Sequence, residues 1–195
     1  MTQLRILGIA LLAVIICAAM VTGETSISMA ISGPGAVNDS TIKVGEPVSV
    51  DIYWDNGDDD RRGFTTGFKV SSETIENVIH VADSGNGVNE AGDIKAHNGW
   101  EGTEAWDFTG VRVIAVDWDG ALPELIGFGG LRVKNVYNKH EKKKVLSWTM
   151  IVPEAGTILI DSSFFKPGGI WAVVGPDGVE VTPGWDGPHV FKVVE

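Results

Sequence analysis

Cysteine is nearly absent from this sequence. The only one, Cys17, lies within an apolar run near the N-terminus. A lone cysteine closes no intramolecular disulfide, and cysteine-based zinc sites need several thiolates. If the apolar run is removed on export, the mature chain also loses its only candidate for a thiolate nucleophile. The sequence therefore predicts a domain stabilised by its core alone, without a disulfide or a cysteine metal site.

Basic residues are scarce as well. The chain has 15 Lys and Arg against 26 Asp and Glu, which gives a formal net charge of −11. A field of this sign repels phosphate and therefore disfavours nucleic acid and anionic lipid as partners. One local basic run, Lys139 with Lys142, Lys143 and Lys144, is interrupted by Glu141 and is predicted to be a solvated hairpin tip.

Catalytic and cofactor motifs are missing too. The four histidines show neither HxxH nor HxH spacing, so no zinc site is predicted. The sequence has no GxSxG motif, no Walker phosphate-binding loop and no dinucleotide fingerprint. These absences predict a protein that is not an enzyme.

Residues 1–23 are predicted to be a signal peptide. An arginine supplies the positive n-region, and the apolar run 6–21 has the length of an h-region. Val21 and Gly23 are small enough for the −3 and −1 positions of a cleavage site, which places the cut before Glu24. The mature product is then secreted, extracellular or periplasmic, and meets the membrane only through the peptide before cleavage.

Two alternatives for this segment stay open. The run is only slightly shorter than a membrane-spanning helix, so it could be retained as an anchor. A lipoprotein would use Cys17, but Ile16 precedes it where a small residue is required. Residues 24–195 are predicted to form one domain in each case, because the sequence shows no internal repeat, linker or second core.

Alternation of apolar and polar residues predicts β-strands along the body of the chain. The clearest example places Val48, Val50, Ile52 and Trp54 on one face. The 25 glycines and 8 prolines favour turns, and no convincing amphipathic helix is present. About nine or ten short strands predict an all-β chain that forms a single antiparallel β-sandwich, immunoglobulin-like or jelly-roll. The predicted strands are 27–31, 48–54, 64–70, 111–116, 126–133, 145–152, 157–161, 169–174 and 189–194.

Two stretches are less regular. The region 83–110 is polar and glycine-rich, and it is predicted to be a long surface excursion, where binding residues tend to concentrate. The stretch 131–152 contains neither Gly nor Pro. Its second half alternates apolar and polar residues, so the stretch is predicted to be a β-hairpin around 138–144.

Three segments resemble known proteins. VGEPVSVDIYWDNGDDDRRGFTTGFKV at 44–70 resembles the first strands of cohesin-like, immunoglobulin-like sandwiches. IGFGGLRV at 126–133, together with the SFF-x-PGG-x-W and W-x-GP blocks within 160–194, resembles a group of uncharacterised secreted bacterial proteins. The resemblance implies a cohesin-like β-sandwich and an exported product. It implies no established activity and identifies no dockerin partner.

The same resemblance concerns Leu159 and Val190. The group has cysteines at the matching positions, which implies that the two strands pair and that an apolar contact here replaces a disulfide. The last strand is then expected to be the weaker edge of the domain, held in part by Trp171 and Trp185.

Four aspartates, Asp55, Asp58, Asp59 and Asp60, crowd a turn after a predicted strand. Calcium favours several carboxylate oxygens that converge from such a loop, which makes these residues its candidate ligands. The EF-hand spacing fails, because Arg61 occupies the glycine position. The preferred interpretation is a solvated acidic turn that keeps a strand edge from pairing.

Asp117 and Asp119 follow another predicted strand and face the same side of it. Paired carboxylates suit glycoside hydrolysis when about 5 to 9 Å separates them. The second acid would have to come from the region 83–110, and nothing in the spacing requires that approach. A turn at Asp119 and Gly120 is therefore the preferred interpretation.

Trp100, Trp106 and Trp118 lie in segments rich in Gly and Asp, and with Asp117 and Asp119 they form a candidate ligand platform. An exposed ring stacks on a sugar face, while adjacent carboxylates bind the hydroxyls. The alternative is a satellite cluster that packs under the long excursion.

Taken together, these patterns predict an exported, non-catalytic β-sandwich that acts as an adhesion, scaffold or surface-interaction module. Its partner is predicted to be a protein or a glycan at the cell surface. The alternative is a carbohydrate-binding module that uses exposed tryptophans. No cofactor is expected unless the aspartate turn binds calcium.

Overall fold

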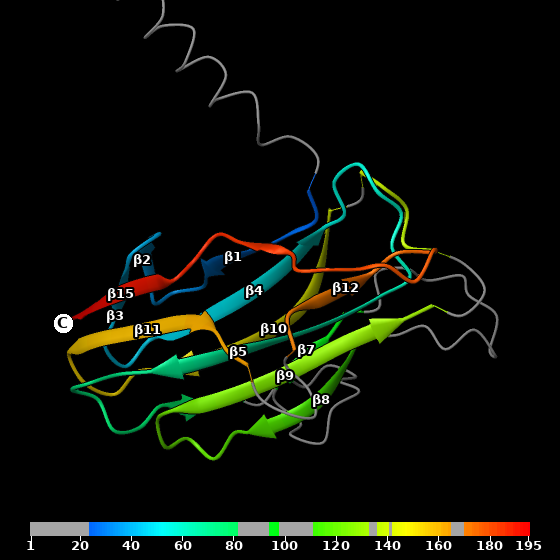
Figure 1. The fold of residues 1–195 in the computed structure, drawn as a ribbon. Helices are drawn as coiled ribbons and strands as arrows, with labels where there is room; N and C mark the ends of the chain where they lie inside the picture. The colour runs from blue at the N-terminus through cyan, green and yellow to red at the C-terminus, as the bar shows by residue number, and fades with distance from the viewer. Residues whose placement is uncertain (1–23, 82–93, 98–110, 133–135, 141, 165–169) are drawn as a thin grey trace, which may run out of the picture.

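The structure is a computed structural model that describes residues 24–81, 94–97, 111–132, 136–140, 142–164 and 170–195. All regular structure in these segments is β-strand, and the strands form two sheets that face each other (Figure 1). The described segments contain no helix long and apolar enough to cross a membrane. The predicted all-β sandwich is confirmed.

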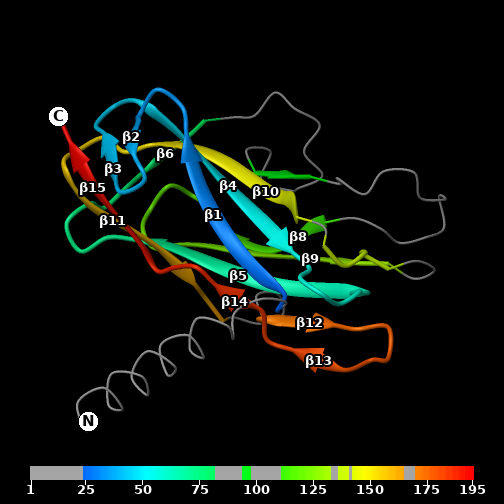
Figure 2. The same cartoon turned by 90° about the horizontal axis from the view of Figure 1, so that it is seen from above.

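Six strands form one sheet, called sheet A. They are β1 (Ser26–Ser32), β4 (Pro47–Asp55), β6 (Ile79–His80), β7 (Ile94–Ala96), β10 (Lys142–Ile151) and β14 (Gly184–Trp185). Their order is β14-β1-β4-β10-β6, and β7 also pairs with β10. The central strand β4 is antiparallel to both β1 and β10, whereas β14 runs parallel to β1. Figure 2 shows β1, β4 and β10 side by side.

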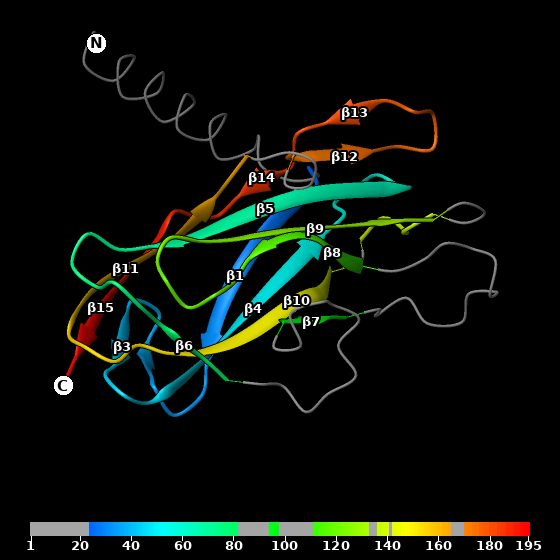
Figure 3. The ribbon, with the colours of Figure 1, turned by 90° about the horizontal axis from the view of Figure 1, so that it is seen from below.

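Nine strands form the other sheet, called sheet B. They are β2 (Ala36–Asn38), β3 (Thr41–Lys43), β5 (Gly63–Ser71), β8 (Val111–Asp117), β9 (Glu124–Leu131), β11 (Gly156–Ser162), β12 (Ala172–Val174), β13 (Glu180–Val181) and β15 (His189–Val194). The order is β13-β12-β5-β11-β15-β3-β2, and β9 pairs with β5 and β8. In the view from below, β5 and β9 cross in front of β1 and β4 (Figure 3).

All nine predicted strands are present, although their ends shift by a few residues. The strands that the sequence analysis did not predict are β2, β3, β6, β7, β13 and β14, and each has only two or three residues. Strands this short carry too few positions to show a period of two. They are placed by pairing with longer neighbours.

The core lies between the sheets and follows the alternation in the sequence. In β4, Val48, Val50, Ile52 and Trp54 are at most 1% exposed, while the residues between them are half-buried. Two aromatic clusters fill much of the interior. Trp54, Phe64 and Tyr137 form one, and Phe68, Phe128, Trp171 and Trp185 form the other.

The predicted hairpin at 131–152 is wrong. β9 belongs to sheet B and β10 to sheet A, so the chain crosses from one sheet to the other between them. Tyr137 holds the crossing by an antiparallel bridge to Arg61, and its ring packs in the core. Lys142–Lys144 are part of β10 rather than a hairpin tip, and the Lys144 Nζ lies 3.0 Å from Asp51 Oδ2.

The last strand is not an edge, contrary to expectation. β15 lies between β11 and β3, pairing antiparallel with the first and parallel with the second. The pairing implied for Leu159 and Val190 is nevertheless present, since the two residues are directly opposed.

Part of the predicted excursion is a strand. Ile94–Ala96 form β7, which pairs with Leu146–Trp148 of β10 and buries Ile94 in the core. His97 continues this contact, because its backbone N–H donates to the Val145 carbonyl. The segments 82–93 and 98–110 lie outside the described residues.

Candidate functional site

The aspartate turn disperses its carboxylates instead of converging them. Asp55 Oδ1 accepts a hydrogen bond from the Gly57 N–H at 3.0 Å, and Asp59 forms an ion pair with Arg61 at 2.9 Å. Asp60 Oδ1 accepts from the Lys139 N–H at 2.9 Å. Asp58 lies 3.5 Å from His140 Nδ1. Arg61 thereby neutralises the charge of one of the four aspartates.

Because these carboxylates have separate partners, they do not converge on a common point where a metal ion could bind. Within the described segments, no group of three or more His, Cys, Asp or Glu side chains is placed to hold a metal ion. The aspartate turn therefore stays a calcium candidate on composition alone, beside the preferred interpretation of a solvated acidic turn.

The second acidic pair forms the predicted turn. Asp119 Oδ1 accepts from the Ala121 N–H at 2.9 Å, and Gly120 has a φ of 92°, a conformation that favours glycine. Asp117 is exposed at the end of β8. The geometry is that of a tight turn.

Trp118 packs inward from this turn. Its ring stacks on His80 with a centroid separation of 4.0 Å and meets Trp148 edge-on at 5.9 Å. Its Nε1 is buried and has no hydrogen-bond partner among the described residues. Trp118 is therefore partly buried and packs against the core. Trp100 and Trp106 lie outside the described residues, so the platform itself stays a prediction.

Below Trp118 lies a polar pair that the sequence analysis missed. Glu124 is fully buried at the start of β9, and its Oε1 lies 2.9 Å from His80 Nε2 on β6. The Gly120 N–H donates to the same oxygen. The pair thus links sheet A to sheet B inside the core. A detectable signal was present, because Glu124 shares the inward register of Ile126 and Phe128.

Burial raises the pKa of the Glu124 carboxyl above its ordinary value, against the opposing effect of the hydrogen bonds from His80 and Gly120. Glu124 Oε2 and His80 Nδ1 are both buried without a hydrogen-bond partner among the described residues. The hydrogen bond between His80 and Glu124 therefore joins the two sheets, while the burial of both polar groups away from water opposes folding.

A first surface hollow of about 500 Å³ lies on the outer face of sheet B. Its apolar part is Leu159 with Val190, and the Val190 side chain is 54% exposed. Lys69 and Glu73 place opposite charges at its rim. The remaining lining residues are Ser71, Ser72, Thr74 and Thr157.

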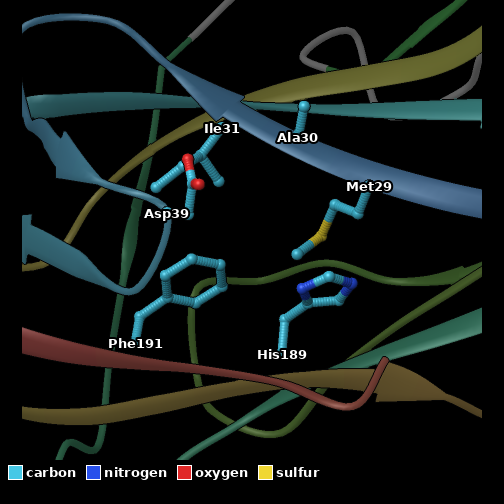
Figure 4. Close-up of a pocket in the computed structure, with 6 residues that line it drawn as sticks. All are labelled: Met29, Ala30, Ile31, Asp39, His189 and Phe191. Atoms are coloured by element: carbon cyan, nitrogen blue, oxygen red, sulfur yellow. The ribbon is translucent and has the colours of Figure 1, made fainter. Parts of the chain in front are cut away.

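A second hollow of about 390 Å³ lies between the edge of β1 and the edge of β15. Met29 and Ile31 point into it from β1, while His189 and Phe191 point into it from β15 (Figure 4). Asp39 reaches it from the turn after β2.

The W-x-GP block forms the wall beside this second hollow. Asp186 Oδ2 accepts from the Met29 N–H at 3.2 Å, and Asp186 Oδ1 lies 2.7 Å from His189 Nε2. A Cβ at Gly187 would overlap Trp185 Nε1, so the indole packs where only glycine fits. The block therefore fastens the chain before β15 to β1.

Comparison with known proteins assigns the fold. No protein-family model matches the sequence, and no curated protein matches it significantly. Among solved structures, a type II cohesin domain from the cellulosome of Acetivibrio cellulolyticus superposes with a TM-score of 0.54, at 18% identity over 86% of this chain and 95% of that one. A chain of a type I cohesin–dockerin complex from Clostridium thermocellum gives a TM-score of 0.50, at 14% identity over 87% of this chain and 99% of that one. The protein has a cohesin-like fold.

Proposed function

We propose that this protein is an exported, non-catalytic module that binds a protein partner. The observation that supports the proposal is the cohesin-like fold, which extends over nearly the whole described chain. One of the similar structures is a cohesin–dockerin complex, so a sandwich of this topology can present a protein-binding surface.

The outer hollow of sheet B suits this role. It combines exposed apolar surface at Val190 and Leu159 with charged residues at its rim, as protein interfaces do. Lys69 and Glu73 supply both signs of charge, which favours one orientation of the partner. The hollow rests on paired strands, so it is rigid before binding.

The test starts with the mature protein, residues 24–195, immobilised and exposed to culture supernatant of the producing organism. A captured protein is then purified, and its Kd is measured against the wild type and Val190→Glu. We expect Val190→Glu to weaken binding at least about tenfold, because it places a charge in the apolar centre of the interface.

The matched control is Ser28→Glu on sheet A, which adds the same charge on a different face. Equal loss in both variants contradicts the assignment to sheet B. A glycan panel followed by tryptophan fluorescence tests the carbohydrate alternative, because a stacked ring changes its emission. Glycan binding without any protein partner contradicts the proposed function.

Export is part of the proposal and has its own measurement. Intact-mass analysis of the secreted protein should give a chain that begins at Glu24. A chain that begins at Met1, or one that carries a lipid on Cys17, contradicts the predicted cleavage.

A further inference from the structure

The sandwich has an opening along one side, where an edge of sheet A faces an edge of sheet B. We call it the seam window, and it consists of Met29–Ile31 on β1, the side chains of His189 and Phe191 on β15, the backbone of Val190 between them, and the hollow that these strands enclose. Side chains from the two strands point toward each other across it (Figure 4). It is separate from the outer hollow of sheet B, since its lining faces the sandwich interior.

The chain itself closes the seam on both sides of the window. β14 pairs with β1 at Ser26 and Ile27, and β3 pairs with β15 over Lys192–Val194. Both pairings are parallel. Between them, none of the described strands pairs with β1 or β15 on its seam side. The window is therefore a gap in a seam that short parallel strands otherwise fill.

The backbone of β1 directs unused hydrogen-bonding groups into this gap. The carbonyls of Thr25 and Ile27 accept from Gly184 and Asp186, so these odd-numbered residues face the seam. The Met29 N–H also faces the seam, because it donates to Asp186. By the alternation of a strand, the N–H and C=O of Ile31 point the same way.

The backbone of β15 does the same from the other side. The Lys192 N–H donates to the Ser40 carbonyl, and the Val194 carbonyl accepts from Val44, so the even-numbered residues face the seam. The N–H and C=O of Val190 therefore point into the window. Among the described residues, no strand pairs with Ile31 or Val190 on this side, and no turn or loop donates to or accepts from these backbone groups.

The width and lining of the window suit an extended peptide. Packed sheets lie about 10 Å apart, twice the distance of about 4.8 Å between paired strands, so one strand fits between two sheet edges. Met29, Ile31 and Phe191 offer apolar contacts on its inner side. Asp39 reaches the window near Ile31 and forms no ion pair with any described residue.

We propose that the seam window binds an extended peptide segment of a partner protein by strand addition, parallel to β1. Alternate apolar side chains of the peptide face Phe191, and a Lys or Arg near its C-terminal end meets Asp39. The net charge of −11 favours a basic segment and opposes a second copy of this chain. This site is independent of the interface proposed on sheet B.

The test uses ¹⁵N-labelled mature protein and three synthetic peptides. Ac-TVTVTK-NH₂ has the proposed pattern, Ac-TVTVTE-NH₂ reverses the charge, and Ac-KTVTVT-NH₂ places the lysine at the other end. With the first peptide, the amide signals of Ile31 and Val190 should shift and their hydrogen exchange should slow. The other two peptides should bind at least about tenfold more weakly.

The matched variants are Ile31→Pro and Ile31→Ala. Both variants remove the isoleucine side chain, but only proline also removes the backbone N–H. Because this N–H faces the window and not β4, neither variant removes a hydrogen bond to β4. Ile31→Pro should bind the first peptide at least about fivefold more weakly than Ile31→Ala. Asp39→Lys should reverse the preference between the first and second peptides, and it tests the site even if the proline variant does not fold.

Three results with the peptides overturn the proposal. They are no binding of the first peptide up to about 1 mM, equal affinity of the proline and alanine variants, and amide shifts on the outer face of sheet B that leave Ile31 unaffected. Concentration-dependent dimerisation through Ile31 and Val190, seen by sedimentation, also overturns it in favour of a second copy. Loss of peptide binding in Ile31→Pro or Asp39→Lys does not bear on the sheet B interface, because neither residue lines the outer hollow, whereas the Val190 side chain that Val190→Glu changes lines that hollow and not the window.

Discussion

Leu159 and Val190 face each other directly across β11 and β15 as a non-hydrogen-bonded pair. The assignment follows from Lys192, whose N–H donates to Ser40 and so points away from β11. Val190 lies two residues earlier in the same strand, so its N–H and C=O also point away from β11. Such pairs have Cα atoms about 4.5 Å apart, within the range that a disulfide spans.

Leu159→Cys combined with Val190→Cys should therefore oxidise without a catalyst. A disulfide that closes a loop of about 30 residues stabilises by about 3 to 4 kcal/mol in the chain-entropy model. We expect the melting temperature of the oxidised protein to exceed that of its reduced form by at least about 5 °C. Free thiols after air oxidation, or an oxidised form that melts no higher, would contradict this geometry.

Val50→Asp should lower the free energy of unfolding by more than about 3 kcal/mol, because Val50 is fully buried in β4 within the hydrophobic core. Ser49→Asp should cost less than about 1 kcal/mol, since Ser49 is half-buried and only its hydrogen bond to Thr149 is lost. Denaturant melts of both variants give the comparison. Equal losses would be inconsistent with the register of β4.

Glu124→Gln should change how stability depends on pH. A buried carboxyl with a raised pKa favours the folded state when protonated, so its contribution is present at low pH and is lost as the pH rises through the folded-state pKa. Glutamine keeps an oxygen for the Gly120 N–H and carries no charge. The variant should therefore gain stability over the wild type as the pH rises from about 4 to about 8.

Denaturant melts across that range measure the effect of Glu124→Gln. Glu154→Gln is the control, because it removes an exposed carboxylate of the same charge. A stability difference between Glu124→Gln and the wild type that stays constant with pH argues against a raised pKa at Glu124.

Chelation should leave the protein unchanged, because the carboxylates of the aspartate turn are engaged with separate partners. We expect EDTA to shift the melting temperature by less than about 5 °C, and added calcium to have no effect. The turn would be a metal site if EDTA lowered the melting temperature by more than this, added calcium restored it, and Asp58→Asn abolished the EDTA effect.

The long strands could be predicted because each carries enough positions to show its period. β4 and the second half of β10 bury alternate residues and leave those between them half-buried, and the sequence alternates accordingly. The crossing at Tyr137 could not be predicted, because alternation reports which face of a strand is buried and not which strand lies beside it. β6 and β7 were missed for a different reason, since two or three residues show no period.

The candidate site was less accessible to sequence reasoning than the fold. The inward position of Trp118 depends on His80, which is 38 residues away in the chain and packs against it only in the sandwich. Glu124 shares the inward register of Ile126 and Phe128, but an acidic residue at the end of a strand is normally expected to be exposed. The seam window has no local signature at all, because it arises from two strand edges at opposite ends of the sequence.

The seam also bears on how the protein folds. The Met29 N–H and the Asp186 carboxylate that accepts from it are 157 positions apart. β1 and β14 close one edge of sheet A, so that edge stays open until the W-x-GP block has been synthesised. Contacts so distant in sequence slow folding, because a long loop must close before any of them forms. During synthesis, the exposed side of β1 is therefore the segment most in need of protection from aggregation.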